Sequence, residues 1–253
     1  ILSTRKRNYN EVDEFLEDWL KKHGTNIKYL TIVAGPKAIR ATVSKGKICD
    51  LVGNCYPYYR PADLDHYADL GGDHTPDLAT GRILGVTVSD ASSLVARSLF
   101  YEEVTPYKEN VSTVAGYEAV GAAERVYGYK KGFSLIGYNT QSSGWSNKAL
   151  IMFFDHGHVN WAGIPSRSIP KLSNSILVIS ACLTCAFDVA EYNPSLFCMA
   201  AIRKGAVAYI GAVSATKTIG TGHFVKSIYG YNKPIGEAFK ELKIVRMLED
   251  HAD

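Results

Sequence analysis

Short apolar runs alternate with amphipathic segments along the second half of the chain. Three runs are apolar almost throughout and have the length of strands: 150–154 (LIMFF), 175–181 (SILVISA) and 206–212 (AVAYIGA). Helical periodicity predicts helices at 194–204, 222–229 and 235–247. Because strands without a polar face must be covered on both sides, this pattern favours a mostly parallel sheet with helices on both faces.

The first half carries the same alternation with more polar residues between the elements. Asn10 is a candidate N-cap for an amphipathic helix whose apolar face holds Val12, Phe15, Leu16, Trp19 and Leu20. A buried strand is predicted at 27–34, further strands at 81–88 and 111–115, and helices at 89–103 and 117–129. We therefore expect a three-layer α/β fold, with residues 1–253 forming a single domain. The start at Ile1 is consistent with excision from a longer precursor.

Composition and charge exclude several classes of protein. The 253 residues carry 28 Lys+Arg against 25 Asp+Glu, a formal net charge of +3, and 46% are hydrophobic. Such values are typical of a globular protein, and the basic clusters are too short and scattered for a nucleic-acid surface. The longest apolar runs are also far shorter than the roughly 20 residues that a membrane-spanning helix needs. We expect neither a nucleic-acid partner nor a membrane span.

Five cysteines leave at least one thiol without an intrachain partner. Cys49 and Cys55 lie in a polar, tyrosine-rich stretch and can form a short disulfide in an oxidising compartment or stay free in a reducing one. Cys198 falls within an apolar helical pattern and is expected in the core. The odd count leaves the compartment open.

The candidate chemistry follows two of the predicted strands. The run at 150–154 is followed by Asp155-His156-Gly157-His158, and the next run leads into Ala181-Cys182. Because reactive groups gather at the carboxyl ends of parallel strands and consecutive strands are usually neighbours, an imidazole and a thiol are expected side by side. An imidazole can make a thiolate available for attack on a carbonyl carbon.

Gly157 adds a second feature of an acyl-transfer site. Without a side chain, its backbone N–H can approach a substrate closely. Together with the N–H of Cys182, it could stabilise the oxyanion of a tetrahedral intermediate. The pattern therefore predicts a nucleophile, a base and an oxyanion hole at one edge of the sheet.

A hydrophobic strand leads to His156-Gly157, and a second hydrophobic strand leads to Cys182, 26 residues after His156. This arrangement resembles the caspase, legumain, clostripain and gingipain group of cysteine peptidases, clan CD. The segments at 72–83, 180–188, 203–216 and 233–239 are similar to the gingipain-type family in order and spacing. The resemblance implies a caspase-hemoglobinase fold and a cysteine endopeptidase working through a thioester acyl-enzyme. It also implies His156 as general acid/base, Cys182 as nucleophile, and the N–H groups of Gly157 and Cys182 as the oxyanion hole. The chain departs from the family pattern at Cys185, where relatives often have glycine, and at His158.

The resemblance carries further expectations about substrates and processing. It implies a protein or peptide substrate, strict preference for one residue before the scissile bond, synthesis as a zymogen, and a secreted or cell-surface location. No cofactor is required, and a structural calcium ion is left open. Ser214 and Ala215, in the segment after the late strand, and Trp161 are candidates for substrate binding. That segment holds no acid, so an Arg or Lys pocket would need a carboxylate from elsewhere, with Asp73, Asp77 and Asp155 as candidates.

Three other interpretations of the same residues stay open. Cys182-Leu183-Thr184-Cys185 is also a CxxC motif, which would suit a thiol-disulfide oxidoreductase. His156, His158, Cys182 and Cys185 supply the residue types of a zinc site. Finally, the fold could serve as a catalytically inactive caspase-like binding module.

Overall fold

The computed structural model describes residues 9–23, 26–35, 38–39, 42–49, 55–61, 66–72, 75–105, 111–115, 134–136, 142–187, 194–213 and 221–250. The chain divides into two compact units, one made of Ile1–Ile83 with Tyr231–Asp253 and the other of Leu84–Gly230. The single peptidase domain expected over residues 1–253 therefore stays a prediction.

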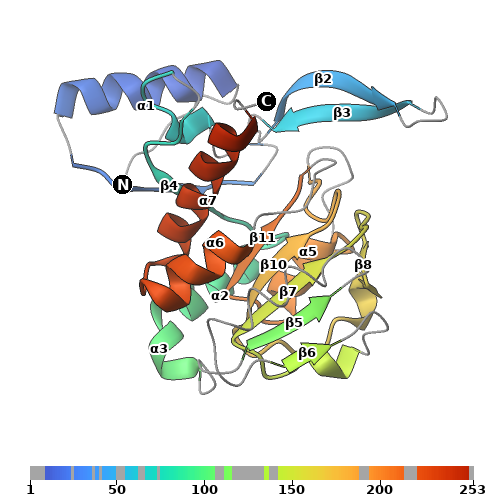
Figure 1. The fold of residues 1–253 in the computed structure, drawn as a ribbon. Helices are drawn as coiled ribbons and strands as arrows, with labels where there is room; N and C mark the ends of the chain where they lie inside the picture. Colours follow the sequence, from blue (N-terminus) through green and yellow to red (C-terminus); the bar gives the residue numbers. More distant parts are fainter. Residues whose placement is uncertain are drawn as a thin grey trace. The chain divides into compact units, whose positions relative to one another are not determined.

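A parallel sheet forms the centre of the unit Leu84–Gly230 (Figure 1). Its strands lie in the order β11-β10-β7-β5-β6, and every pairing among them is parallel. The bounds are β5 (Val111–Ala115), β6 (Ser134–Ile136), β7 (Leu150–Phe154), β10 (Ile176–Ser180) and β11 (Ala208–Gly211). The mostly parallel α/β sheet expected from the apolar runs is thus confirmed.

The apolar runs form these strands because both of their faces are covered. All five side chains of β7 are buried, as are four of the five on β10. Ile151 and Phe153 of β7 share one core cluster with Leu177 and Ile179 of β10, and Phe197 packs into the same cluster. The central strands are therefore held from both sides, which fixes where their carboxyl ends lie.

Helices flank this sheet (Figure 1). They are α2 (Val88–Leu99), α3 (Tyr101–Val104), α5 (Phe197–Arg203) and α6 (Thr221–Val225), which continues into the π-helical turn η4 (Lys226–Gly230). A capping box between Thr87 and Asp90 starts α2. Asp90 also pairs with Arg203 at 3.3 Å, and Arg97 donates to the carbonyl of Ile202 at 2.8 Å, so polar contacts at two points join α2 to α5. Shorter elements complete the unit: η2 (Ser142–Trp145), β8 (Trp161–Ala162), β9 (Ile164–Pro165) and η3 (Ser166–Ser168).

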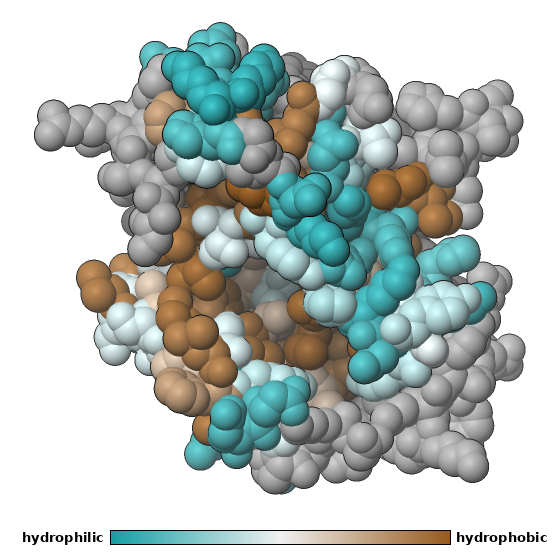
Figure 2. All heavy atoms as spheres, turned by 90° about the vertical axis from the view of Figure 1, so that its left-hand side faces the viewer, coloured by the Kyte–Doolittle hydropathy of each residue, from teal (hydrophilic) through white to brown (hydrophobic). Residues whose placement is uncertain are grey.

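Apolar and hydrophilic residues share the face drawn in Figure 2. Several exposed apolar side chains of this unit come from α2 and from the short helix after it, namely Val88, Val95, Leu99, Phe100 and Val104. On the same helix, Leu94 is buried. The helix α2 is therefore amphipathic with some apolar side chains left at the surface.

The unit made of Ile1–Ile83 and Tyr231–Asp253 combines two long helices with small sheets. The helices are α1 (Tyr9–His23) and α7 (Ile235–Asp250), with the short turn η1 (His66–Ala68). Strands β1 (Tyr29–Val33) and β4 (Ala79–Ile83) pair in parallel, and β2 (Thr42–Cys49) and β3 (Cys55–Pro61) form an antiparallel hairpin. The hairpin register sets Cys49 opposite Cys55.

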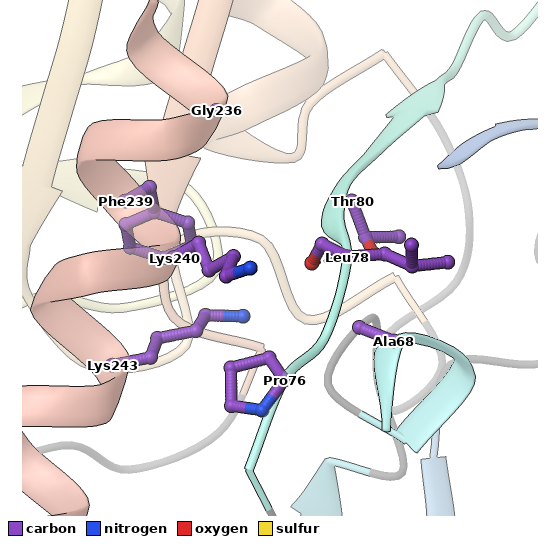
Figure 3. Close-up of a pocket in the computed structure, with 8 residues that line it drawn as sticks. All are labelled: Ala68, Pro76, Leu78, Thr80, Gly236, Phe239, Lys240 and Lys243. Carbon is purple, nitrogen blue, oxygen red and sulfur yellow. Dashed lines mark hydrogen bonds between the residues drawn. The ribbon is translucent and has the colours of Figure 1, made fainter. Parts of the chain in front are cut away.

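A small pocket lies beside α7 in this unit (Figure 3). Phe239, Lys240 and Lys243 line it from the helix, facing Leu78 and Thr80. The Lys240 ammonium donates to the carbonyl of Asp77 at 2.7 Å, and the Lys243 ammonium lies 4.6 Å from the Phe239 ring centroid. Both lysines are thus engaged with neighbours in the chain.

Several element predictions need correction. The first helix begins at Tyr9, so Asn10 lies inside its first turn and is not the N-cap. Strand β1 is not a buried strand, because Tyr29, Thr31 and Val33 are exposed and only Ile32 is buried. The predicted strand 81–88 is shifted, since β4 ends at Ile83 and Val88 already begins α2. The hairpin of β2 and β3 was not predicted.

The remaining predicted elements agree with the structure or lie outside it. Strands β5, β7, β10 and β11 and helices α2, α5, α6 and α7 occur where the pattern predicts them, within a few residues at their ends. The helix expected at 117–129 lies outside the described residues. Among the helices that the structure describes, none combines the length and the apolar composition that crossing a membrane requires.

Candidate functional site

The predicted histidine and cysteine follow neighbouring strands. Parallel strands β7 and β10 pair in register up to Phe154 opposite Ser180, and the N–H of Asp155 donates to the carbonyl of Ser180 at 3.4 Å. His156 and Cys182 each come two residues after the end of their strand. The structure therefore brings the two segments together at one edge of the sheet, as their sequence positions predict.

Gly157 is where the two segments touch. A Cβ atom built on Gly157 would lie 2.5 Å from the Cβ of Ala181 and 3.1 Å from the carbonyl oxygen of Cys182. Real Cβ atoms do not approach other atoms as closely as 2.5 Å, so a side chain at this position would force the segments apart. The glycine is required here by space.

His156 itself is exposed at this edge. Its backbone N–H donates to Oδ1 of Asp155 at 2.7 Å, so the Asp155 carboxylate accepts a hydrogen bond from the residue that follows it. This bond holds the turn after β7. Of the three acids considered for substrate binding, Asp155 thus lies next to the histidine, Asp77 belongs to the other unit and Asp73 lies outside the described residues.

Cys182 is not part of a disulfide, and its side chain is partly exposed. It is followed by Leu183, whose φ of 60° is left-handed, and by buried Thr184. The turn is fixed by two backbone bonds, Ala186 N–H to Leu183 at 3.1 Å and Cys185 N–H to Ala212 at 2.9 Å. A partly exposed thiol on a well-held turn is what a nucleophile needs.

Cys185 forms a disulfide with Cys198, the second residue of α5. Both cysteines are buried. This pairing overturns the CxxC interpretation, because Cys185 is bonded away from Cys182. It also removes Cys185 as a thiolate ligand for zinc. The expectation that Cys198 lies in the core is confirmed. Its disulfide bond to Cys185 was not expected from the sequence.

His158 and Trp161 form a tight turn after Gly157. Their backbones exchange two hydrogen bonds, at 2.8 and 3.1 Å. The His158 side chain is exposed, as expected for a residue at the rim, and Trp161 is 37% exposed. The turn is anchored to α5 because the N–H of Phe197 donates to the carbonyl of Val159 at 2.7 Å. Ser214 and Ala215, the other candidates for substrate binding, lie outside the described residues.

Two residues beneath the site carried no signal in the sequence. Thr184 is fully buried between the two cysteines of the motif, and Tyr209 of β11 packs against Phe197. Burial raises the pKa of Tyr209 well above its usual range, and a smaller effect of Thr184 opposes that shift. The Tyr209 hydroxyl nevertheless makes no hydrogen bond of ordinary geometry with the described residues. Only the strand pairing, which the sequence does not give in detail, places these two side chains together.

Comparison with solved structures shows a shared fold. The structure of the Arg specific cysteine proteinase gingipain R (RGPB) matches with a TM-score of 0.73 at 16% identity, covering 95% of this chain and 63% of that chain. The complex of Porphyromonas gingivalis RgpB pro- and mature domains matches with a TM-score of 0.71 at 15% identity, covering 96% of this chain and 64% of that chain. The chain thus spans less than two thirds of the length of both structures.

Comparison at the level of sequence gives the family. No curated protein matches the chain. The model of peptidase family C25, in contrast, matches residues 3–252, nearly the whole chain. This match spans both compact units and both the His-Gly and the Ala-Cys motifs, and it agrees with the gingipain-like fold. The resemblance carried by the His-Gly and Ala-Cys motifs is therefore confirmed: the chain belongs to peptidase family C25, the gingipain family of cysteine peptidases of clan CD.

Proposed function

We propose that the chain is a cysteine endopeptidase that cleaves proteins or peptides through a dyad of Cys182 and His156. The observation that carries the proposal is the junction at Gly157, where the His-Gly turn after β7 meets the Ala-Cys turn after β10. It supports the proposal because a cysteine outside any disulfide, an exposed histidine and two backbone N–H groups follow neighbouring strands at one edge of the sheet.

The first half of the reaction is acylation. His156 takes the proton of the Cys182 thiol, and the thiolate sulfur attacks the scissile carbonyl carbon, forming a C–S bond. The carbonyl π electrons move to oxygen, and the N–H groups of Gly157 and Cys182 donate to this oxyanion. When the intermediate collapses, the C–N bond breaks and the leaving amine takes the proton from His156. A thioester remains on Cys182.

The second half is hydrolysis of the thioester. His156 removes a proton from water, and the resulting hydroxide attacks the thioester carbon. A second oxyanion forms in the same hole and collapses, which breaks the C–S bond. The sulfur recovers its proton from His156, the acid product leaves, and both side chains return to their starting states.

The residue before the scissile bond is part of the proposal. Arginine is the first residue to test, because gingipain R, which shares the fold, is Arg specific. The segment 212–218 carries no acid, so an arginine pocket here would need a carboxylate from another segment. A pocket for an uncharged side chain makes no such demand.

A fluorogenic peptide library varied at this residue tests the proposal. We expect the wild-type chain to cleave a restricted set of peptides, and both Cys182→Ala and His156→Ala to lose turnover by at least about a thousandfold while keeping their circular dichroism spectra. Cys185→Ala is the matched control, since it removes a sulfur that takes no part in the reaction. We expect it to keep most of the activity.

Two results would contradict the proposal. Equal cleavage by wild type and Cys182→Ala would exclude the thiol as nucleophile. Equal loss in Cys182→Ala and Cys185→Ala, together with reduction of insulin disulfides by the wild type, would favour the oxidoreductase interpretation instead.

A further inference from the structure

Thr184 lies beneath the junction of the two catalytic turns. It is fully buried and follows Cys182 by two residues in the turn after β10. A Cβ atom built on Gly157 would lie 3.0 Å from Cγ2 of Thr184. The methyl group of Thr184 is therefore one of the surfaces on which Gly157 rests.

The hydroxyl group of Thr184 serves a different neighbour. Its Oγ1 donates to the carbonyl of Ala181 at 3.4 Å within the same turn. It also lies 3.0 Å from the position that a Cβ atom on Gly211 of β11 would take. The two arms of the side chain thus have separate contacts, the methyl with the His-Gly turn and the hydroxyl with its own turn and β11.

The backbone of Thr184 has little room to move. Its carbonyl accepts a hydrogen bond from the N–H of Cys198 at 3.0 Å. The next residue, Cys185, donates its N–H to the carbonyl of Ala212 and forms the disulfide with Cys198. Because packed interiors transmit small displacements, a shift at Thr184 reaches Gly157 directly. The anchored threonine acts as a fixed support for the glycine.

We infer that Thr184 is a positioning residue for the oxyanion hole, its methyl group holding the Gly157 N–H at the depth where it meets the substrate oxygen. This inference rests on the proposed function, in which that N–H is a donor. Oxyanion donors act only when they lie within a few tenths of an ångström of their place, so a methyl-sized gap below the glycine weakens catalysis more than binding.

Two variants separate the arms of the side chain. Thr184→Ser keeps the hydroxyl and removes the methyl, whereas Thr184→Val keeps a methyl in the same place and replaces the hydroxyl by a second one. We expect Thr184→Ser to lower kcat about tenfold with KM changed less than about twofold, and Thr184→Val to keep kcat within about threefold. The second variant is the matched control for packing.

Alkylation of Cys182 by iodoacetamide is the second readout. This reaction needs the thiolate and makes no use of an oxyanion hole, so its rate and pH profile should be the same in wild type and both variants. Unchanged kcat in Thr184→Ser, equal loss in both variants, or a parallel fall in the alkylation rate would each overturn the inference. If Thr184→Ser does not fold, a tenfold loss of kcat in folded Thr184→Val overturns it, and retention within threefold supports it.

Failure of the proposed function gives a different result. A wild-type chain that is alkylated at Cys182 but cleaves no peptide of the library contradicts the peptidase proposal itself. A wild type that cleaves normally beside an unimpaired Thr184→Ser variant contradicts only the role of Thr184.

Discussion

At the scale of single residues, a missing side chain lets the His-Gly turn after β7 and the Ala-Cys turn after β10 meet. Ala181, Thr184 and Cys182 lie so close to Gly157 that a Cβ atom at this position would collide with them. The same residue is proposed to give its N–H to the oxyanion. Residue 157 must therefore pack closely against the Ala-Cys turn and also leave its N–H accessible to the substrate. Glycine, which has no side chain, allows both.

Gly157→Ala should separate the turns. We expect kcat to fall at least a hundredfold, because the added methyl collides with Ala181 and displaces the N–H of residue 157. We also expect overpacking to cost about 1–3 kcal/mol of stability. Steady-state kinetics and thermal melting measure both effects.

Gly81→Ala is the control for this experiment. A Cβ atom at Gly81 would meet nothing within 4 Å, so the same chemical change should leave both kcat and the melting temperature close to those of wild type. A Gly157→Ala chain that is as active as Gly81→Ala would show that the junction is looser than its contacts indicate.

The sequence alone suggests the residues that we propose to react at this site, but not the residues that support them. His156, Gly157 and Cys182 could be named because each follows an apolar run that must end at the sheet edge. Thr184 and Tyr209 could not, because their importance comes from contacts between segments that the pattern of apolar residues does not specify. The partner of Cys185 has no signal in the sequence for the same reason, since its separation of 13 from Cys198 matches no spacing rule.

At the scale of elements, the turn that carries Cys182 is held to α5. The disulfide joins Cys185 to Cys198, and the N–H of Cys198 donates to the carbonyl of Thr184. The His158–Trp161 turn is fastened to the same helix through Phe197 and Val159. A helix of seven residues thus holds the turn that carries Cys182 and the turn that follows Gly157.

Removing the disulfide should cost stability more than activity. With a sequence separation of 13 between the cysteines, the loss of chain restriction in the unfolded state amounts to about 3 kcal/mol. We expect the double variant Cys185→Ala, Cys198→Ala to melt about 5–10 °C lower than wild type. Cleavage at 25 °C should stay within about threefold.

Cys182→Ala is the matched control, because it removes a sulfur that is not part of a disulfide. Its melting temperature should match that of wild type. If the double variant and the control melt together, the disulfide adds nothing to the stability of the folded chain.

The elements themselves were predicted with unequal success. Strands such as β7 are apolar at every position because they are covered on both faces, and this leaves a clear pattern. The hairpin of β2 and β3 has lysine, glycine and tyrosine in place of such a run, and β1 is mostly exposed despite its apolar sequence. The pattern of hydrophobic residues locates the centre of a sheet better than its margins.

At the scale of the whole molecule, a family match that covers residues 3–252 extends over both compact units. The single-domain proposal predicts that these units unfold together. We expect one calorimetric transition for the wild type, and one transition at a lower temperature for the double cysteine variant. Two separate calorimetric transitions, of which the double cysteine variant shifts only one, would contradict the single-domain proposal. The disulfide lies within Leu84–Gly230 alone, so its loss would then destabilise that unit by itself.

The pairing of Cys185 with Cys198 also bears on how an active sample is recognised. The three sulfur atoms of Cys182, Cys185 and Cys198 can pair in three ways, and two of these consume Cys182, the proposed nucleophile. All three isomers have the same mass, so weighing the intact protein cannot tell an active preparation from an inert one. Labelling the remaining thiol and mapping the labelled peptide can, because only the correctly paired isomer carries its label on Cys182.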